Sequence, residues 1–151
     1  MKFCASIMYL ALISVTVLST NSFAENSSRL AIEGEAATKV INTLKKVGFS
    51  AQTTDYGDFV SASRVDCIHA GVGESVLDSC TAMDYQKHIF KIQDGDASAL
   101  LTLLFAAGAK NQVTNTEATT LSVYALDCLD WNVVAQPGDA QQVPTCLFNN
   151  P

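Results

Sequence analysis

Four cysteines carry the most regular chemical pattern in the sequence. They are Cys67, Cys80, Cys128 and Cys146. They form two pairs whose members are separated by 12 and 17 residues, and an aspartate directly precedes the first member of each pair. Cysteine thiols can bind zinc or form disulfides, but neither spacing contains the Cys-x-x-Cys element of common zinc sites. The sequence therefore favours disulfides over a metal site.

An internal repeat selects one disulfide pairing. Four cysteines allow three pairings. Seven residues that end in the first Asp-Cys recur, with related residue types, 61 positions later. If both copies fold alike, each disulfide lies inside its own copy. The sequence thus predicts Cys67–Cys80 and Cys128–Cys146, each of which contributes roughly 3 kcal/mol by limiting the unfolded chain.

Acid–base chemistry has only a few candidates in this chain. Asp66 and Asp127 occupy equivalent repeat positions, and two carboxylates near an axis between the copies could share a proton. Alternatively, each aspartate accepts backbone hydrogen bonds at a hairpin edge. The two histidines, His69 and His88, would point to a hydrolase only beside a carboxylate in a cleft. Because the sequence contains no hydrolase, zinc-protease or phosphate-binding motif, we predict no catalytic residue, metal or cofactor.

The segment between Cys128 and Cys146 is the best candidate for a binding surface. It is five residues longer than its first-copy equivalent and holds the only tryptophan. A loop closed by a disulfide loses less entropy on binding, and an aromatic anchor is typical of protein interfaces. Alternatively, the tryptophan folds back over the open end of the sheet. The predicted binding residues are Trp131, Asn132, Val133, Val134 and Pro137.

The first 24 residues have the pattern of a cleaved export signal. Lys2 precedes an apolar stretch at 7–18, and small residues around Ala24 suit a signal peptidase. The apolar stretch is about 12 residues long, whereas a membrane-spanning helix needs ~20. We expect cleavage after Ala24, a mature single domain of residues 25–151 with no membrane insertion, and a periplasmic or secreted location where disulfides form.

Charge narrows the class of partner. The chain carries a net charge of −6, and removal of Lys2 with the signal would make it −7. The sequence has no basic run, so nucleic acid and anionic membrane surfaces are not expected partners. An acidic domain attracts a basic partner at long range, although net charge also keeps an exported protein in solution.

Two helices are expected, 60 positions apart. Residues 33–47 place apolar side chains at i, i+3, i+4 and i+7, the pattern of an amphipathic helix. Residues 96–107 are apolar on nearly every face, with Asp94 and Asp96 as candidate caps. A glycine follows each helix, as is common at helix ends. The apolar second helix is expected to be central, with the first helix outside it.

Strand-like segments follow both helices and predict the fold class. The expected strands are 59–68, 76–83, 85–92, 120–129 and 143–148, and the polar residues 25–30 are expected to be a frayed terminus. The order α-β-β-β-α-β-β predicts an α+β fold with an antiparallel sheet. It would consist of tandem duplicated helix-plus-hairpin units, at about 33–92 and 94–151, each with one disulfide inside its hairpin.

Tandem helix-plus-hairpin repeats with one disulfide each resemble the β-lactamase inhibitory proteins in architecture. The resemblance concerns architecture and assigns no residue a role. We expect an exported, non-catalytic protein-binding module, such as an inhibitor or immunity-type protein that acts on an exported enzyme. The alternatives are a small-molecule-binding or envelope-structural periplasmic protein, with a pocket between the second helix and the sheet, and then a small hydrolase.

Overall fold

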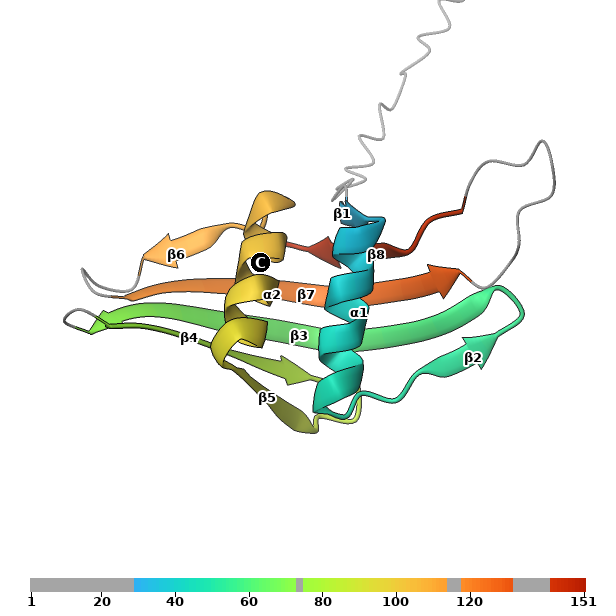
Figure 1. Cartoon of the computed structure of the whole chain (residues 1–151), viewed down its shortest axis with the longest axis horizontal. Coiled ribbons are helices and arrows are strands. Elements are labelled where there is room, and N and C mark those ends of the chain that lie inside the picture. Colours follow the sequence, from blue (N-terminus) through green and yellow to red (C-terminus); the bar gives the residue numbers. More distant parts are fainter. Residues whose placement is uncertain (1–28, 73–74, 114–117, 132–141) are drawn as a thin grey trace, which may run out of the picture.

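The computed structural model describes residues 29–72, 75–113, 118–131 and 142–151 (Figure 1). The predicted signal, residues 1–24, lies outside these ranges. The described chain forms two helices and eight strands. In chain order they are β1 (Leu30–Glu33), α1 (Glu35–Val47), β2 (Gln52–Thr54), β3 (Gly57–Val72), β4 (Ser75–Met83), β5 (Ile89–Gln93), α2 (Asp94–Ala106), β6 (Asn111–Val113), β7 (Ala118–Trp131) and β8 (Thr145–Asn149).

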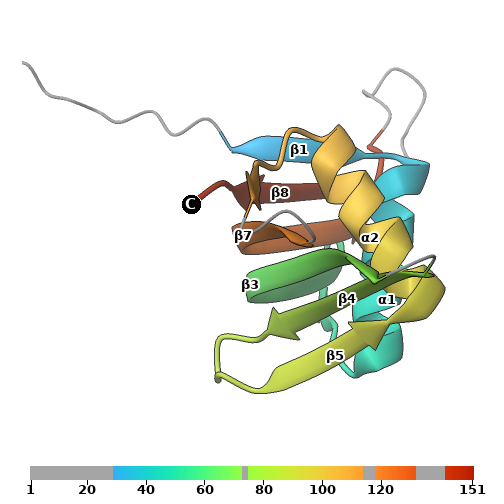
Figure 2. The same cartoon turned by 90° about the vertical axis from the view of Figure 1, so that its left-hand side faces the viewer.

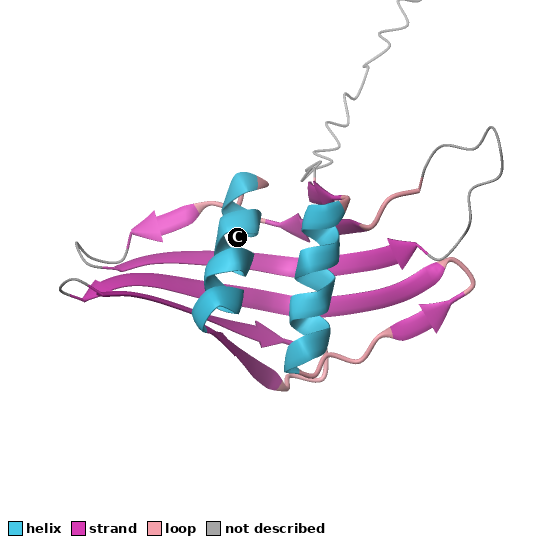
Figure 3. Ribbon diagram, viewed as in Figure 1, coloured by secondary structure: helices cyan, strands magenta, loops and turns pink. Residues whose placement is uncertain are grey.

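All eight strands belong to one antiparallel sheet. Its order is β1-β8-β7-β3-β4-β5, while β2 pairs with β3 and β6 pairs with β7. Both helices cover the same face of this sheet, as Figures 2 and 3 show from two directions. Antiparallel sheets commonly bury only one face. The predicted class, α+β with an antiparallel sheet, is therefore confirmed.

α1 forms where the amphipathic pattern predicted a helix. Its buried residues are Ala37, Val40, Ile41 and Leu44. On the exposed side, Lys39 Nζ pairs with Glu35 Oε1 one turn away at 2.9 Å. The helix ends at Gly48, whose φ of 115° suits glycine and whose N–H donates to the Lys45 carbonyl at 3.1 Å.

α2 differs from its prediction at its start and in its position. It begins at Asp94, and neither Asp94 nor Asp96 caps it, since the N-cap residue is Gln93 without a side-chain cap. Asp96 Oδ2 instead accepts from Lys46 Nζ at 2.5 Å, which joins the two helices. The helices lie side by side on the sheet, and Phe105 is 55% exposed. The prediction of a central second helix is therefore wrong, because only one side of α2 is buried.

The described helices are short. Each contains 13 residues. Neither is long and apolar enough to cross a membrane.

The alternation of buried and exposed residues along the long central strands β3 and β7 shifts by one residue at one point. Buried residues alternate up to Ala62 and resume at Val65, and β7 shows the same break between Val123 and Leu126. The ladder skips one pair at this point, and Ala125 adopts a left-handed φ of 49°. The break keeps apolar side chains under both helices along strands of 16 and 14 residues.

The two predicted disulfides are confirmed. Cys67 on β3 lies directly opposite Cys80 on β4, and Cys128 on β7 lies opposite Cys146 on β8, with Cα–Cα distances of 4.0 Å. All four residues belong to the buried core. Disulfides of this kind are typical of proteins that fold in an oxidising environment.

Three short strands were missing from the predicted element order. Residues 25–30 were expected to be frayed, but Leu30 begins β1, which pairs with β8. β2 and β6 are also additional to the α-β-β-β-α-β-β prediction. Strands of three or four residues are too short for a periodic pattern, so tertiary pairing decides them.

Positions 60 residues apart make corresponding contacts in the two halves. Ile32 of β1 pairs with Cys146, and Ile92 of β5 pairs with Cys80. Directly after them, α1 and α2 begin. The helices also end alike, because residues 49 and 109 donate their N–H groups to the carbonyls of residues 44 and 104 at 3.1 and 3.0 Å.

Candidate functional site

A gap in strand pairing interrupts one side of β3. β7 pairs with β3 along its length, whereas on the other side β2 covers residues 57–59 and β4 covers residues 64–72. In the described chain, residues 60–63 have no strand neighbour on that side. A cavity of about 720 Å³ lies at this gap, and we call it the notch. Its volume is within the range of small-ligand sites.

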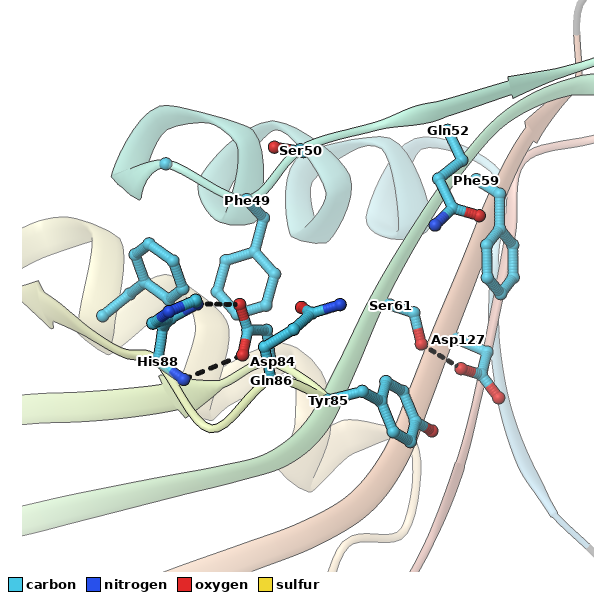
Figure 4. A pocket seen from close by; sticks show the side chains of 12 residues that line it. Phe49, Ser50, Gln52, Phe59, Ser61, Asp84, Tyr85, Gln86, His88 and Asp127 are labelled. Atoms are coloured by element: carbon cyan, nitrogen blue, oxygen red, sulfur yellow. Dashed lines mark hydrogen bonds and ion pairs between the residues drawn. The ribbon is translucent and has the colours of Figure 1, made fainter.

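The notch collects residues from four separate parts of the chain (Figure 4). It is lined by Gly48, Phe49, Ser50 and Gln52 after α1, Phe59 and Ser61 of β3, Asp84, Tyr85, Gln86, His88 and Phe90 around the β4–β5 turn, and Asp127 of β7. The rings of Phe49 and Phe90 pack with centroids 4.5 Å apart, and Phe49 is only 6% exposed. The lining thus combines aromatic rings with amide, hydroxyl and carboxylate groups.

Asp84 and His88 form a carboxylate–histidine pair in the notch. Asp84 Oδ2 lies 2.9 Å from His88 Nδ1, and Asp84 Oδ1 accepts from the His88 N–H at 2.8 Å. His88 precedes β5 instead of lying in a strand as predicted. A carboxylate that orients a histidine is one element of a hydrolase. The other histidine, His69, pairs with Asp78 Oδ1 at 2.6 Å and lies outside the notch.

The serine in the notch is not paired with this histidine. Ser61 Oγ donates to Asp127 Oδ1 at 2.5 Å, and Figure 4 shows Ser61 and His88 bound to different aspartates. Asp127 Oδ2 also accepts from Arg29 at 2.7 Å. The notch therefore brings together a carboxylate–histidine pair and a serine–carboxylate pair without a nucleophile–base contact between them.

The shared-proton hypothesis for Asp66 and Asp127 is wrong. Asp127 lies opposite Ser61 in the β3–β7 ladder, whereas Asp66 lies on β3 itself, five positions further along. At 3.2–3.4 Å per residue the two are roughly 16 Å apart. Asp66 Oδ1 instead accepts from Ser122 at 2.6 Å and from Arg64 at 2.9 Å. Both aspartates thus make equivalent cross-strand bonds to serine.

Trp131 is the one predicted binding residue that the structure describes. It ends β7 opposite Gly57, and its ring makes an edge contact with Tyr56 at 6.5 Å between centroids. Tyr56 is 64% exposed. The other predicted residues, Asn132, Val133, Val134 and Pro137, lie outside the described residues. An aromatic pair therefore marks the start of the disulfide-closed segment.

The sheet face opposite the helices presents a mixed aromatic and aliphatic surface, which we call the uncovered face. Its side chains alternate with the buried ones along each strand. They include Phe59, Arg64 and Ile68 of β3, Met83 of β4, Ile89 of β5, and Tyr124, Leu129 and Trp131 of β7. The Arg64 guanidinium lies 5.2 Å from the centre of the Tyr124 ring. In Figure 2 no described helix lies on this side of the sheet.

No metal centre is found in the part of the chain that the structure describes. No group of three or more histidine, cysteine, aspartate or glutamate side chains is placed there to hold an ion. Comparison with protein-family models, with characterised proteins and with solved structures finds no match. The geometry of the notch and of the uncovered face is thus the basis for the functional proposal.

Acid should weaken the fold partly through Asp84. Burial by itself raises the pKa of this carboxyl, but hydrogen bonds from His88 outweigh burial and hold the pKa below its usual 3.8. A depressed pKa contributes stability that is complete above the unfolded value and is lost as pH falls through the folded value. We expect the free energy of unfolding to decrease below about pH 4, and less steeply in Asp84→Asn. Urea unfolding between about pH 2 and 6 measures this, and identical pH profiles would contradict it.

Sequence reasoning missed the notch because its residues carry no shared motif. Ser50, Gln52 and Ser61 are ordinary polar residues of turns and strands in the sequence. The notch exists because β2 and β4 end on either side of residues 60–63. The only sequence signal was the break between the expected strands 76–83 and 85–92, because residues around this break supply the other wall of the notch.

Proposed function

We propose that the protein is an exported, non-catalytic module that binds another exported protein through the uncovered face of its sheet, beside Trp131. The observation that carries this proposal is the one-sided covering of the sheet by both helices. The opposite face exposes Ile68 at 43% and Ile89 at 65%, and Arg64 and Tyr124 lie opposite each other on the neighbouring strands β3 and β7. Aromatic residues and arginine, surrounded by aliphatic side chains, are typical of protein interfaces.

The proposed partner has a basic surface. The chain has 15 acidic and 9 basic residues. Around the Trp131 end of the sheet, Arg29 pairs with Asp127 and Lys45 pairs with Asp58, so neither of these two basic side chains is free to attract an acidic partner. Complementary charge accelerates association and discriminates against acidic competitors. An inhibitor of an exported enzyme, or an immunity-type protein, would act in this way.

We propose a non-catalytic role because the notch does not place a nucleophile against a base. The His88–Asp84 pair favours the hydrolase alternative, but Ser61 donates to Asp127 instead of to His88. A serine nucleophile needs a base within hydrogen-bond reach. A binding role needs no such contact.

Export is supported by the disulfides and by the first residues of the chain. The two buried disulfides suit an oxidising compartment. We infer that residues 1–24 direct the chain to the periplasm or to the outside and that cleavage leaves residues 25–151 as one domain.

We infer that the two halves of this domain are copies of one β-α-β-β-β unit. The ladder β2–β3 matches β6–β7, and each unit contains one disulfide between its last two strands. The first strand of each unit pairs with the last strand of the other, since β1 pairs with β8 and β5 pairs with β4. Because of this exchange, the first unit begins at β1 and the second begins at β5, instead of each unit beginning at its helix.

A Trp131→Ala variant should lose most of its affinity for the partner. Truncation of an aromatic anchor at an interface costs about 2 kcal/mol or more, which is at least about 30-fold in Kd. The mature protein is immobilised, the exported proteins of its own source are passed over it, and the retained partner is purified for calorimetry. Phe105→Ala is the matched control, because Phe105 is an exposed aromatic on the helix side. Equal affinities for Trp131→Ala and the wild type would contradict the proposed surface.

A further inference from the structure

The second half of the molecule contains a clamped carboxamide. Asn150 Oδ1 accepts from the Lys110 N–H at 3.1 Å, and Asn150 Nδ2 donates to the Gly108 carbonyl at 3.2 Å. The two bonds settle the orientation of the amide, because an N–H requires the oxygen and a carbonyl requires the NH₂ group. The backbone after α2 thus binds one primary amide at two points.

The first half presents the same backbone pair in the notch. Sixty positions before Gly108 and Lys110 stand Gly48 and Ser50. Both glycines have left-handed φ angles, 115° and 98°, and both are followed by a residue that donates to the last helical turn. The strands that follow, β2 and β6, pair in matching register with β3 and β7. The backbone conformation that clamps the amide is therefore repeated at the notch.

In the described structure, the backbone pair in the notch has no hydrogen-bond partner from the protein. The Gly48 carbonyl and the Ser50 N–H make no hydrogen bond with any described group, and both residues line the notch. The residue at the position of Asn150 is Asp84, since each stands four residues after the second cysteine of its disulfide. Asp84 is bound to His88, and a carboxylate has no hydrogen to donate to a carbonyl.

We propose that the notch is a subsite for a primary carboxamide, the side chain of an asparagine or glutamine of the bound partner. The Ser50 N–H donates to the amide oxygen, and the amide NH₂ donates to the Gly48 carbonyl. The choice of a protein side chain as the source rests on the proposed function. A backbone amide fits less well, because a trans peptide group directs its N–H and C=O to opposite sides.

The remaining lining explains why an amide is preferred over an acid. The carboxylates of Asp84 and Asp127 lie in the same cavity, and an aspartate or glutamate side chain would bring a third negative charge beside them. Phe49 and Phe90 form an apolar wall for the methylene groups of the side chain. The notch therefore selects a neutral, short, polar side chain.

A fragment titration tests the subsite without any partner. ¹⁵N-labelled mature protein is titrated with propionamide, and with propionate and N,N-dimethylpropionamide as matched compounds that lack the NH₂ donor. We expect propionamide to shift the backbone amide signal of Ser50 in a saturable way, with at least about fivefold weaker binding of the other two, as the loss of one hydrogen bond predicts. Equal responses to all three compounds, or no response at Ser50, would overturn the proposal.

Asp84→Asn provides the decisive variant. It places an asparagine where the second half has Asn150, so its own amide should occupy Gly48 and Ser50 and weaken propionamide binding at least about fivefold. Asp78→Asn is the matched control, because it removes a carboxylate that pairs with a histidine outside the notch. Unchanged propionamide binding by Asp84→Asn would count against the subsite.

Measuring how tightly the captured partner binds each variant tests whether the amide comes from a protein side chain. This question is separate from whether the subsite exists. If Asp84→Asn also weakens binding of the captured partner, the partner supplies the amide. If the partner binds Asp84→Asn as tightly as the wild type while propionamide does not, the protein side chain is excluded as the source and the proposed function still stands. If propionamide binds but no partner depends on Trp131, the subsite stands and the proposed function fails.

Discussion

Gly57→Ala should destabilise the protein by at least about 3 kcal/mol, whereas Gly71→Ala should have almost no effect. A Cβ at Gly57 would lie 2.0 Å from the carbonyl oxygen of Asp130 and 3.0 Å from the Cα of Trp131. Both are backbone atoms of the neighbouring central strand, so neither can turn away. The φ of 153° at Gly57 adds backbone strain for any other residue.

The same substitution at Gly71 is the control for the change in chain entropy. A Cβ there meets no atom within 4 Å, although Gly71 belongs to the same strand. Urea unfolding of both variants compares their midpoints with that of the wild type. Similar losses of stability in the two variants would show that the close approach of β3 and β7 at Gly57 does not hold in solution.

Phe148→Ala should cost about 3–5 kcal/mol, the usual range for a buried phenylalanine. Phe148 is fully buried in β8, next to the disulfide at Cys146 and opposite Leu30 of β1. Its loss leaves a cavity that the cross-linked strands cannot close by moving together. The large cost follows from this restraint.

Phe105→Ala serves as the comparison for Phe148→Ala, since the side chain of Phe105 is 55% exposed and its removal opens no cavity. We expect this variant to remain within about 0.5 kcal/mol of the wild type. Thermal and urea unfolding measure both variants. A small loss for Phe148→Ala would mean that the end of β8 is not part of the cooperative core.

Several elements could be predicted because their signals are local. α1 has a full amphipathic period and a terminal glycine, so the prediction of residues 33–47 differs from Glu35–Val47 by only two residues. The disulfides could be paired from the repeat, since both Asp-Cys segments have to form the same hairpin. Those predictions needed no knowledge of distant contacts.

Other features depend on contacts between segments far apart in the chain. The caps of α2 were mispredicted because the Asp96 carboxylate forms an ion pair with Lys46, 50 positions away, instead of capping the helix. The acid pair that the repeat allowed does not form, because the ladder places Asp127 opposite Ser61. A side chain with several possible partners takes the one that the strand register brings to it.

The amino-acid sequence by itself determined the fold class, the two helices and the disulfide pairing, because periodicity and repetition are properties of neighbouring residues. Only the tertiary structure decided which sheet face the described helices leave uncovered and where β3 has a described strand neighbour on one side only. The physical reason is that a strand's partners are set by the competition of all segments for the same hydrogen bonds. The notch lies where, among the described strands, that competition leaves residues 60–63 without a partner on one side, beside Gly48 and Ser50.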